Sequence, residues 1–245
     1  MIADLGVAAG DNSVSSNRRF FTSPSIALVE GPQGPELAVV IGSGFRPSPL
    51  GLLADNKIFM IRQADVFGSA MSYQKLTLDD LYDASSNVLA TASGAELNSA
   101  RELLNNASGW YVDLTIPGEK ALSAPLIAND QVIITTYAPG SDGVSCSPGA
   151  GTSRAYVLEL KDGGVNKQVT LDTTSIVDQA AILAPPPDPD PEPAATGYEQ
   201  DDVNDINAGD SCPQGSKFIV MLNAEDEPID NWCNNPSKTY WMKAR

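Results

Sequence analysis

The sequence predicts a mainly β chain, organised as a partial or modified β-propeller of four-stranded antiparallel blades with one inserted amphipathic helix. Residues 109–163 carry four short alternating or β-branched runs, separated by turns rich in Gly, Pro, Asn and Asp. Period-two runs bounded by such turn residues are typical of strands and hairpins. Four strands in about 55 residues match the size of one propeller blade.

A second unit of the same kind occupies residues 19–62, which makes the blade a repeat. The matched segments are residues 23–26 with 124–127, 38–42 with 132–136, and 57–62 with 155–160. Pro24 and Pro125 lie about two blade lengths apart, at ~40–50 residues for each blade.

The elements are expected in the following order. Strands are predicted at residues 19–29, 36–42, 57–62, 110–114, 121–127, 131–137, 155–160 and 166–171, with Asn129-Asp130 as a hairpin turn. Between the two units, residues 94–107 carry apolar residues at a three-to-four spacing, which predicts the helix, with Ser93 as its cap and Gly109 just past its end. Residues 76–81 are expected to form the entry of a further helix, with Thr77 as the N-cap candidate and acidic residues in the first turn.

The C-terminal part changes in composition. Residues 185–193 are rich in proline, which predicts a polyproline-like conformation, and acidic residues continue to residue 210. Strands at 217–223 and 238–243 are expected to pair as a final hairpin. We expect one β-propeller-type domain over residues 1–245, about half of a full propeller, with residues 185–210 as an acidic, Pro-rich loop within it.

Composition excludes several functions. The formal net charge of −16 argues against binding to nucleic acid. The sequence contains no run of about 20 apolar residues, so no transmembrane segment is predicted. The chain has no histidine, which removes the commonest general base and a common zinc ligand. We therefore expect a protein that is not an enzyme, with no catalytic residues.

The three cysteines form no CxxC motif. In an exported protein we expect one disulfide and a spare thiol. Cys212 and Cys233 flank one predicted strand and are the favoured pair, with Cys146 as the spare or as an alternative partner. Three free thiols in a cytosolic protein are the other reading.

The acidic segment is the one candidate metal site. Its oxygen ligands are of the kind that Ca²⁺ prefers, and a solvated acidic loop is the simpler interpretation. No register satisfies the EF-hand pattern of ligands, glycine and terminal glutamate. The candidate calcium ligands are Asp201, Asp202, Asn204, Asp205, Asn207 and Asp210.

A series of short motifs, taken in order, resembles the PilY family of type IV pilus proteins. They lie at residues 17–24, 41–50, 59–62, 76–81, 109–114, 146–153 and 239–241, and include Asn17-Arg18-Arg19-Phe20-Phe21, Gly42-Ser43-Gly44-Phe45-Arg46 and Gly109-Trp110-Tyr111-Val112-Asp113. The resemblance covers most of residues 1–164 and the last few residues.

The resemblance implies a C-terminal propeller domain of a large exported protein at the cell surface, outer membrane or pilus tip. Members promote type IV pilus assembly, oppose retraction, and act in adhesion and twitching motility. The implied partners are major and minor pilins and a host or abiotic surface. The family's calcium loop of alternating aspartates is not visible here, and the ending Trp241-Met242-Lys243 departs from the family's usual one.

Two other function classes fit the same strand repeats. A quinoprotein-like propeller dehydrogenase would need a cofactor-stacking tryptophan and a metal-ligating carboxylate at the propeller centre. A secreted carbohydrate- or protein-binding module would use the acidic loop at 185–210 as its contact surface.

Overall fold

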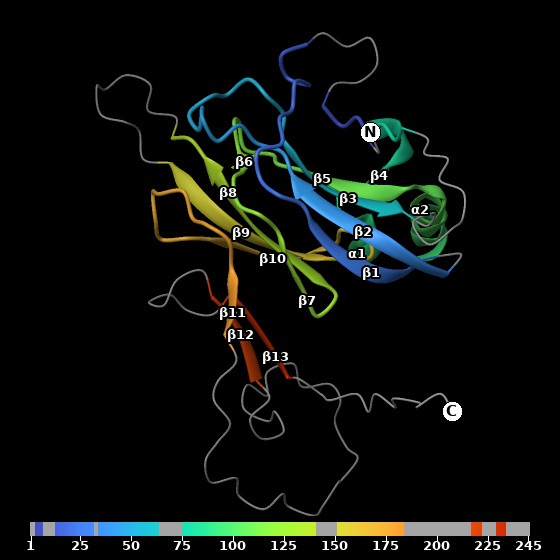
Figure 1. Ribbon diagram of the computed structural model, residues 1–245. Helices are drawn as coiled ribbons and strands as arrows, with labels where there is room; N and C mark the ends of the chain where they lie inside the picture. Colours follow the sequence, from blue (N-terminus) through green and yellow to red (C-terminus); the bar gives the residue numbers. More distant parts are fainter. Residues whose placement is uncertain are drawn as a thin grey trace, which may run out of the picture. The chain divides into compact units, whose positions relative to one another are not determined.

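The computed structural model describes residues 3–6, 13–31, 34–63, 75–140, 151–183, 217–221 and 229–233 (Figure 1). They belong to two compact units, residues 1–180 and residues 181–245. The mainly β class predicted from the sequence is confirmed, and the sheets do not close into a ring. The single domain over 1–245 stays a prediction, and the loop at 185–210 lies outside the described residues.

The first sheet has the strand order β1-β2-β3-β5-β4. Its strands are β1 (Ser25–Gly31), β2 (Gly34–Gly42), β3 (Lys57–Gln63), β4 (Tyr82–Asp83) and β5 (Gly109–Asp113). The pairs β1–β2, β2–β3 and β3–β5 are antiparallel, which gives the expected four-stranded blade. The two-residue strand β4 adds a parallel pair at the β5 edge.

The second sheet is also antiparallel and contains five strands. Its strands are β6 (Lys120–Ala121), β7 (Leu126–Ala128), β8 (Gln131–Ala138), β9 (Thr152–Glu159) and β10 (Val165–Thr170). Both β6 and β7 pair with β8, as two pieces of one edge strand. The predicted Asn129-Asp130 turn is confirmed, with φ values of 50° and 58° in the left-handed region that such a tight turn requires.

The structure corrects two details of the predicted blade at residues 109–163. Its first predicted strand pairs with β3, so β5 belongs to the other sheet, and β10 takes the fourth place instead. The strand predicted at 121–127 is interrupted between β6 and β7. There the Ser123 hydroxyl accepts a hydrogen bond from the Thr135 amide at 3.1 Å, in place of a ladder partner.

The two sheets share one hydrophobic core. The first sheet contributes Ala38, Val40, Ile58 and Met60, and the second contributes Val132, Ile134, Tyr156, Leu158 and Leu160 from its neighbouring strands and turn. Trp110 of β5 lies fully buried among them, and its indole nitrogen donates to the Leu160 carbonyl oxygen at 3.0 Å. The core therefore ties the first and second sheets together within the first unit.

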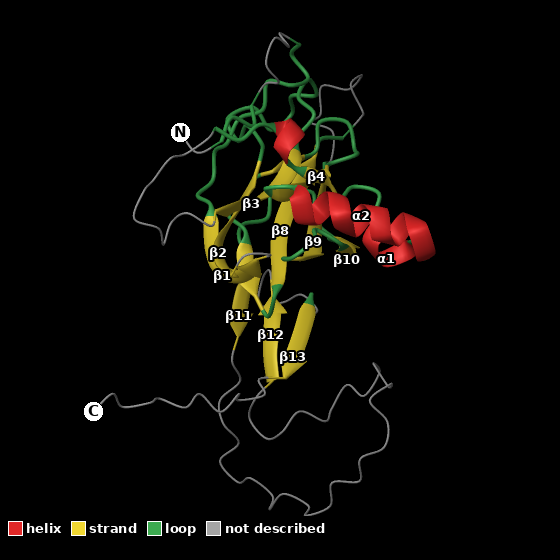
Figure 2. Ribbon diagram, turned by 90° about the vertical axis from the view of Figure 1, so that its right-hand side faces the viewer, coloured by secondary structure: helices red, strands yellow, loops and turns green. Residues whose placement is uncertain are grey.

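The inserted helix α2 (Gly94–Asn106) is confirmed, and the four-residue helix α1 (Val88–Thr91) precedes it and lies beside it (Figure 2). Ser93 is the N-cap residue, as predicted, and its side chain makes no capping hydrogen bond. At the other end, the Arg62 guanidinium donates to the carbonyl oxygens of Leu104 at 2.8 Å and Ala107 at 2.5 Å. A cation on the last carbonyls satisfies them and complements the helix dipole.

The segment predicted to be helical at residues 76–81 forms a short 3₁₀ helix, Leu78–Asp80. Thr77 is its N-cap, as expected, because the Asp80 carboxylate accepts from the Thr77 backbone amide at 2.7 Å. No helix among the described residues is long and apolar enough to cross a membrane.

The second unit contains the sheet β11-β12-β13, with β11 (Ala181–Leu183), β12 (Lys217–Met221) and β13 (Asp230–Cys233). The strand predicted at 217–223 is confirmed as β12. In the described residues β12 pairs with β11 on one edge and with β13 on the other, and not with a final strand as predicted. The strand predicted at 238–243 lies outside the described residues.

We expect Gly109→Ala to lower the free energy of unfolding by about 2–3 kcal/mol. Gly109 has φ 149°, and a Cβ there would lie 2.0 Å from the Met60 carbonyl oxygen across the β3–β5 pair. Urea denaturation measures the loss. Gly94→Ala is the matched control: its φ of 61° also penalises alanine, but its Cβ would meet no atom within 4 Å, so about 1 kcal/mol is expected. Equal losses at the two sites would contradict the close approach at Gly109.

Candidate functional site

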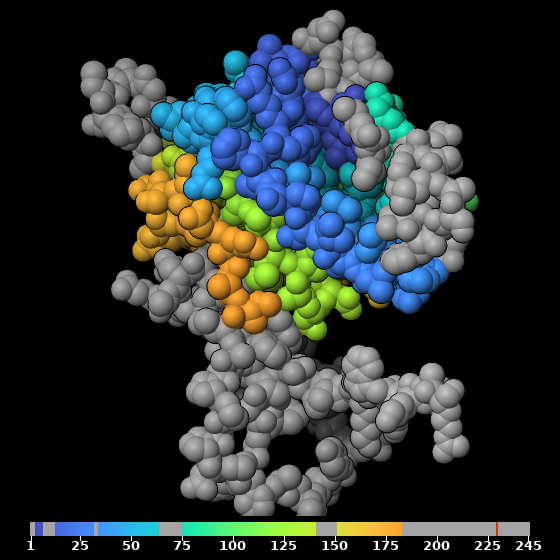
Figure 3. Space-filling view, in the orientation of Figure 1, coloured from blue at the N-terminus to red at the C-terminus, as the bar shows by residue number. Residues whose placement is uncertain are grey.

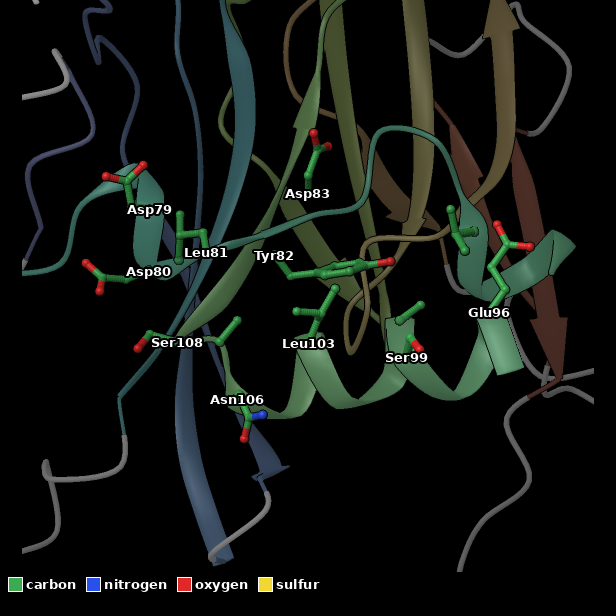
Figure 4. Close-up of a pocket in the computed structure, with 13 residues that line it drawn as sticks. Asp79, Asp80, Leu81, Tyr82, Asp83, Glu96, Ser99, Leu103, Asn106 and Ser108 are labelled. Atoms are coloured by element: carbon green, nitrogen blue, oxygen red, sulfur yellow. The ribbon is translucent and has the colours of Figure 1, made fainter. Parts of the chain in front are cut away.

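A pocket of about 650 Å³ opens between α2 and the segment that contains the 3₁₀ helix and β4 (Figure 4). Its acidic lining residues are Asp79, Asp80, Asp83 and Glu96. In Figure 4 Tyr82 and Leu103 lie between Asp79 and Asp80 at one end and Glu96 at the other. The pocket therefore combines an apolar interior with acidic ends.

Hydrogen bonds hold two of these carboxylates in place. Asp80 accepts from the Thr77 amide and hydroxyl, at 2.7 and 2.9 Å, and Asp83 accepts from the Ser85 amide at 2.9 Å. Burial alone would raise the pKa of Asp83, but hydrogen bonds from Ser85 and Tyr111 and the charge of Lys57 bring that pKa below its usual value. Asp83 is thus a carboxylate anion at neutral pH.

The phenols beside this pocket remain protonated at neutral pH. Burial raises the pKa of Tyr82, with the charges of Asp162 and Asp83 adding to the effect. Burial also raises the pKa of Tyr111, whose hydroxyl bonds the Asp83 carboxylate. A neutral phenol beside carboxylate anions makes the pocket suited to a positively charged side chain with an apolar stem.

A buried carboxylate lies elsewhere in the first unit, at the turn before β6. Glu119 is 1% exposed, and its Oε1 atom accepts from the Thr136 hydroxyl at 2.6 Å and the Tyr156 hydroxyl at 3.0 Å. The Asn56 amide donates to the Glu119 backbone carbonyl at 2.9 Å. Burial, together with Glu119, raises the pKa of Tyr156. These contacts join the turn to β8, β9 and the start of β3, which is a structural role.

The neighbouring Lys120 is buried as well. Its ammonium group donates to the carbonyl oxygens of Pro49 at 3.0 Å, Gly118 at 2.6 Å and Gly51 at 2.5 Å. Burial lowers the pKa of Lys120 to about 8. The ammonium thus anchors the loop of residues 49–51 to the edge of the second sheet.

The shifted pKa of Lys120 predicts a pH dependence. Between about 8 in the folded state and 10.5 in the unfolded state, the unfolded chain binds more protons. Stability therefore rises with pH across this window, by at most about 1.4 kcal/mol for each pH unit. Denaturation of the wild type and of Lys120→Met from pH 7 to 10 isolates this contribution, because the tyrosines titrate in both. A constant difference between the two proteins would contradict the prediction.

The sites predicted from the sequence consist mostly of residues outside the described ranges. All six candidate calcium ligands, Asp201, Asp202, Asn204, Asp205, Asn207 and Asp210, lie outside the described residues, as do Cys146 and Cys212. Cys233 is the last residue of β13. Because Cys212 lies outside the described residues, the Cys212–Cys233 disulfide stays a prediction. Within the described ranges, no group of three or more Cys, Asp or Glu residues is arranged to hold a metal ion.

Sequence reasoning missed both the pocket and the buried Glu119. Asp79 and Asp80 were interpreted only as acidic residues in a helical first turn. Glu119 follows Pro117-Gly118, a pattern typical of an exposed turn, and the adjacent Lys120 strengthens that impression.

Comparisons with known proteins give a partial match. No family model matches the chain. A segment of 61 residues is 39% identical to a protein of Xylella fastidiosa described as a "Type IV pilus biogenesis factor PilY1 homolog", and covers 23% of this chain and 4% of that protein.

The chain is also similar to a solved structure, the C-terminal domain of PilY1 from Pseudomonas aeruginosa. The TM-score is 0.44 at 17% identity, over 66% of this chain and 34% of that one. The chain therefore spans a small part of the relatives that it matches.

Proposed function

We propose that this chain, a member of the PilY family, is a non-catalytic part of a type IV pilus biogenesis factor. The observation that carries the proposal is the 39% identity over 61 residues to a relative described as such a factor. It agrees with the ordered motifs of residues 17–164 that resemble the family. Because the match covers 4% of the relative, the activity of the whole protein is part of the proposal.

The finer role that we propose is control of pilus assembly and retraction, together with surface adhesion. The partners would be major and minor pilins, and the location would be outside the cell, at the surface, outer membrane or pilus tip. In this role the protein binds other proteins and performs no reaction. The polar groups of the first unit support this, since Glu119, Lys120 and Asp80 are each used in contacts that hold the fold.

The acidic pocket is the proposed contact site for a basic side chain of a pilus component. Its acidic ends attract a lysine or arginine head group, and its apolar interior, which includes Leu81, Val88 and Ala100, accommodates the stem. The net charge of −16 also attracts basic partners at longer range and so favours their encounter with the chain.

The test is complementation of a chromosomal deletion in the organism that encodes the protein. We expect the deletion to remove surface pili and twitching, and we expect pili to return when retraction is blocked as well. Wild-type numbers of surface pili in the deletion strain would contradict the proposed function.

The pocket is tested by the double variant Asp79→Asn with Glu96→Gln. It removes two charges from the pocket without changing the size of the side chains, so twitching is expected to fall while the protein level stays constant. The matched control is Glu102→Gln, on an exposed position of α2 that does not line the pocket. Equal twitching in the two strains would exclude the pocket while leaving the pilus function intact.

A further inference from the structure

Two neighbouring segments of the first unit form a surface without acidic residues. Residues 13–24 and 43–54 contain no Asp or Glu, although the chain has 31 such residues. The segments lie side by side, because the Gly44 amide donates to the Arg19 carbonyl oxygen at 2.7 Å. Figure 3 shows both segments, in two shades of blue, together on the surface of the unit. We call these two segments the acid-free surface.

Large apolar side chains project from the acid-free surface. Those that are 53–70% exposed are Val14, Phe21, Leu50, Leu52 and Leu53. In Figure 1 the loop that carries the three leucines stands beyond the ends of β2 and β3. Val14 and Leu53 line one cavity of about 220 Å³, which joins the two segments. Single exposed apolar residues are common, but a group of them on adjoining loops marks an interface.

The loop that carries the leucines is held by hydrogen bonds to the rest of the unit. The Lys120 ammonium donates to the carbonyl oxygens of Pro49 at 3.0 Å and Gly51 at 2.5 Å. The Gly51 amide donates to the Ser48 carbonyl oxygen at 3.2 Å, which closes a turn between the two prolines and the leucines. A loop that is already ordered loses little conformational entropy on binding. The structure therefore presents these leucines in a form prepared for contact.

Arginines flank the exposed apolar side chains. Arg19 is exposed and lines the same cavity, and its guanidinium lies 4.3 Å from the centre of the Phe45 ring. Arg46 makes an ion pair with Asp178 at 3.1 Å, and 41% of the Arg46 side chain is exposed. Guanidinium groups bind phosphate oxygens well, often through two parallel hydrogen bonds. The acid-free surface thus combines donors for phosphate with apolar side chains.

The types of side chain favour a lipid surface over a protein partner. Leucine and valine are under-represented among the residues that dominate protein–protein binding, where tryptophan and tyrosine are enriched. Leucine, phenylalanine and valine all partition favourably into the bilayer. Arginine keeps its head group at the lipid phosphates while its stem lies along apolar groups. The combination on this surface matches the interface of a bilayer.

We propose that the acid-free surface docks the first unit on a phospholipid membrane, with Leu50, Leu52 and Leu53 inserted below the head groups and Arg19 on lipid phosphates. In this arrangement the chain lies on the membrane and does not span it. The net charge of −16 opposes the approach, but exposed charges farther than about 8 Å are largely screened at physiological ionic strength, and the docking surface itself carries no acidic residue. The proposal rests on this surface alone and not on the pilus function.

Flotation of the purified chain with vesicles of phosphatidylcholine and phosphatidylglycerol tests the proposal. The wild type is expected to float with the vesicles. The double variant Leu50→Ser with Leu53→Ser is expected to lower the partition coefficient at least about tenfold, since two aliphatic side chains no longer enter the membrane. Leu103→Ser, at a leucine of α2 that is 64% exposed, is the matched control and should bind as the wild type does. No flotation of the wild type, or equal flotation of the double variant, would overturn the proposal.

The arginine contribution is measured with the same vesicles. Arg19→Gln is expected to lower the partition coefficient about fivefold, and the difference from the wild type should shrink at high salt. Arg101→Gln, at an exposed position of α2, is the matched control and is expected to have no effect. Equal losses from the two substitutions would show that net charge, and not the acid-free surface, governs the binding, and would overturn the proposal.

Two further measurements identify the cause of any loss. The melting temperatures of the leucine and arginine variants are expected to equal that of the wild type, because all the substituted side chains are exposed. Benzoylphenylalanine at Leu53 is expected to cross-link to lipid, and the same probe at Leu103 is expected to give no lipid product. A cross-link from Leu53 to a protein, with no lipid product, would assign the surface to a protein partner and overturn the proposal.

Discussion

Replacing Trp110 with alanine is expected to lower the free energy of unfolding by about 3–5 kcal/mol, since a large buried aromatic side chain leaves a cavity that the sheets cannot fill. Trp110 is fully buried in the core between the two sheets. The substitution also removes the indole N–H that bonds the Leu160 carbonyl oxygen at 3.0 Å. Gly163 approaches the indole so closely that a Cβ there would lie 2.7 Å from the ring, so the surroundings are shaped to it.

Urea denaturation of the purified chain, followed by circular dichroism, measures this loss. Trp110→Phe separates the two contributions, because it keeps much of the apolar volume and removes the hydrogen bond. Leu103→Ala is the control, since Leu103 is 64% exposed on α2 and should cost well under 1 kcal/mol. A loss below about 1 kcal/mol for Trp110→Ala would mean that the two sheets do not share a core.

Glu119→Ala is expected to cost about 2–5 kcal/mol, because it removes the shared acceptor of two buried hydroxyl groups. The substitution leaves the hydroxyls of Thr136 and Tyr156 without their acceptor inside the protein. An unsatisfied buried polar group costs about 1–3 kcal/mol by itself.

The comparison of Glu119→Gln with Glu119→Ala identifies the cause. In the wild type, Glu119 Oε2 accepts a hydrogen bond from the Ile116 N–H at 3.4 Å. Glutamine keeps one acceptor oxygen for the two hydroxyls, but its NH₂ group would face the Ile116 N–H and could not accept that bond. We therefore expect glutamine to recover a large part of the loss. Glu102→Ala, at an exposed position of α2, serves as the carboxylate control. Equal stability of the Gln and Ala variants would show that burial of volume, and not hydrogen bonding, makes Glu119 important.

The strands were predictable because their residue types are local signals. The runs that became β2, β3, β8 and β9 are apolar or β-branched and end at turn residues, and each lies within a few residues of its prediction. The sheet to which each strand belongs was harder to predict than the strand itself. Strand β5 follows a helix, and its pairing with β3 depends on the path of the chain through that helix, which no local pattern specifies.

Register is the clearest case of information that residue types do not contain. Matching the strings of residues 38–42 and 132–136 makes Ala38 equivalent to Val132, whereas the closing pairs of the hairpins make it equivalent to Thr135. The two alignments differ by an odd number of residues, which exchanges the faces of the strand. The stacking of the two sheets could be understood only once the pairing was known.

The candidate site was less predictable than the fold. The acidic pocket joins residues 79–83 with α2, and these meet only in the folded chain. Glu119 has the sequence surroundings of an exposed turn, and its burial follows from the packing of Asn56, Thr136 and Tyr156 around it. Residue type alone cannot distinguish a carboxylate that faces water from one that holds three segments together.

The path of β5 has a consequence for folding kinetics. In the second sheet, β7, β8, β9 and β10 follow one another along the chain and each pairs with the next, so their contacts are local. In the first sheet, β3 pairs with β5, which lies much later in the chain because helices α1 and α2 intervene between the two strands. Contacts between distant parts of the chain carry a larger loop-closure entropy and form more slowly. We therefore expect the second sheet to form first during folding, and the first sheet to be completed later, when β5 pairs with β3.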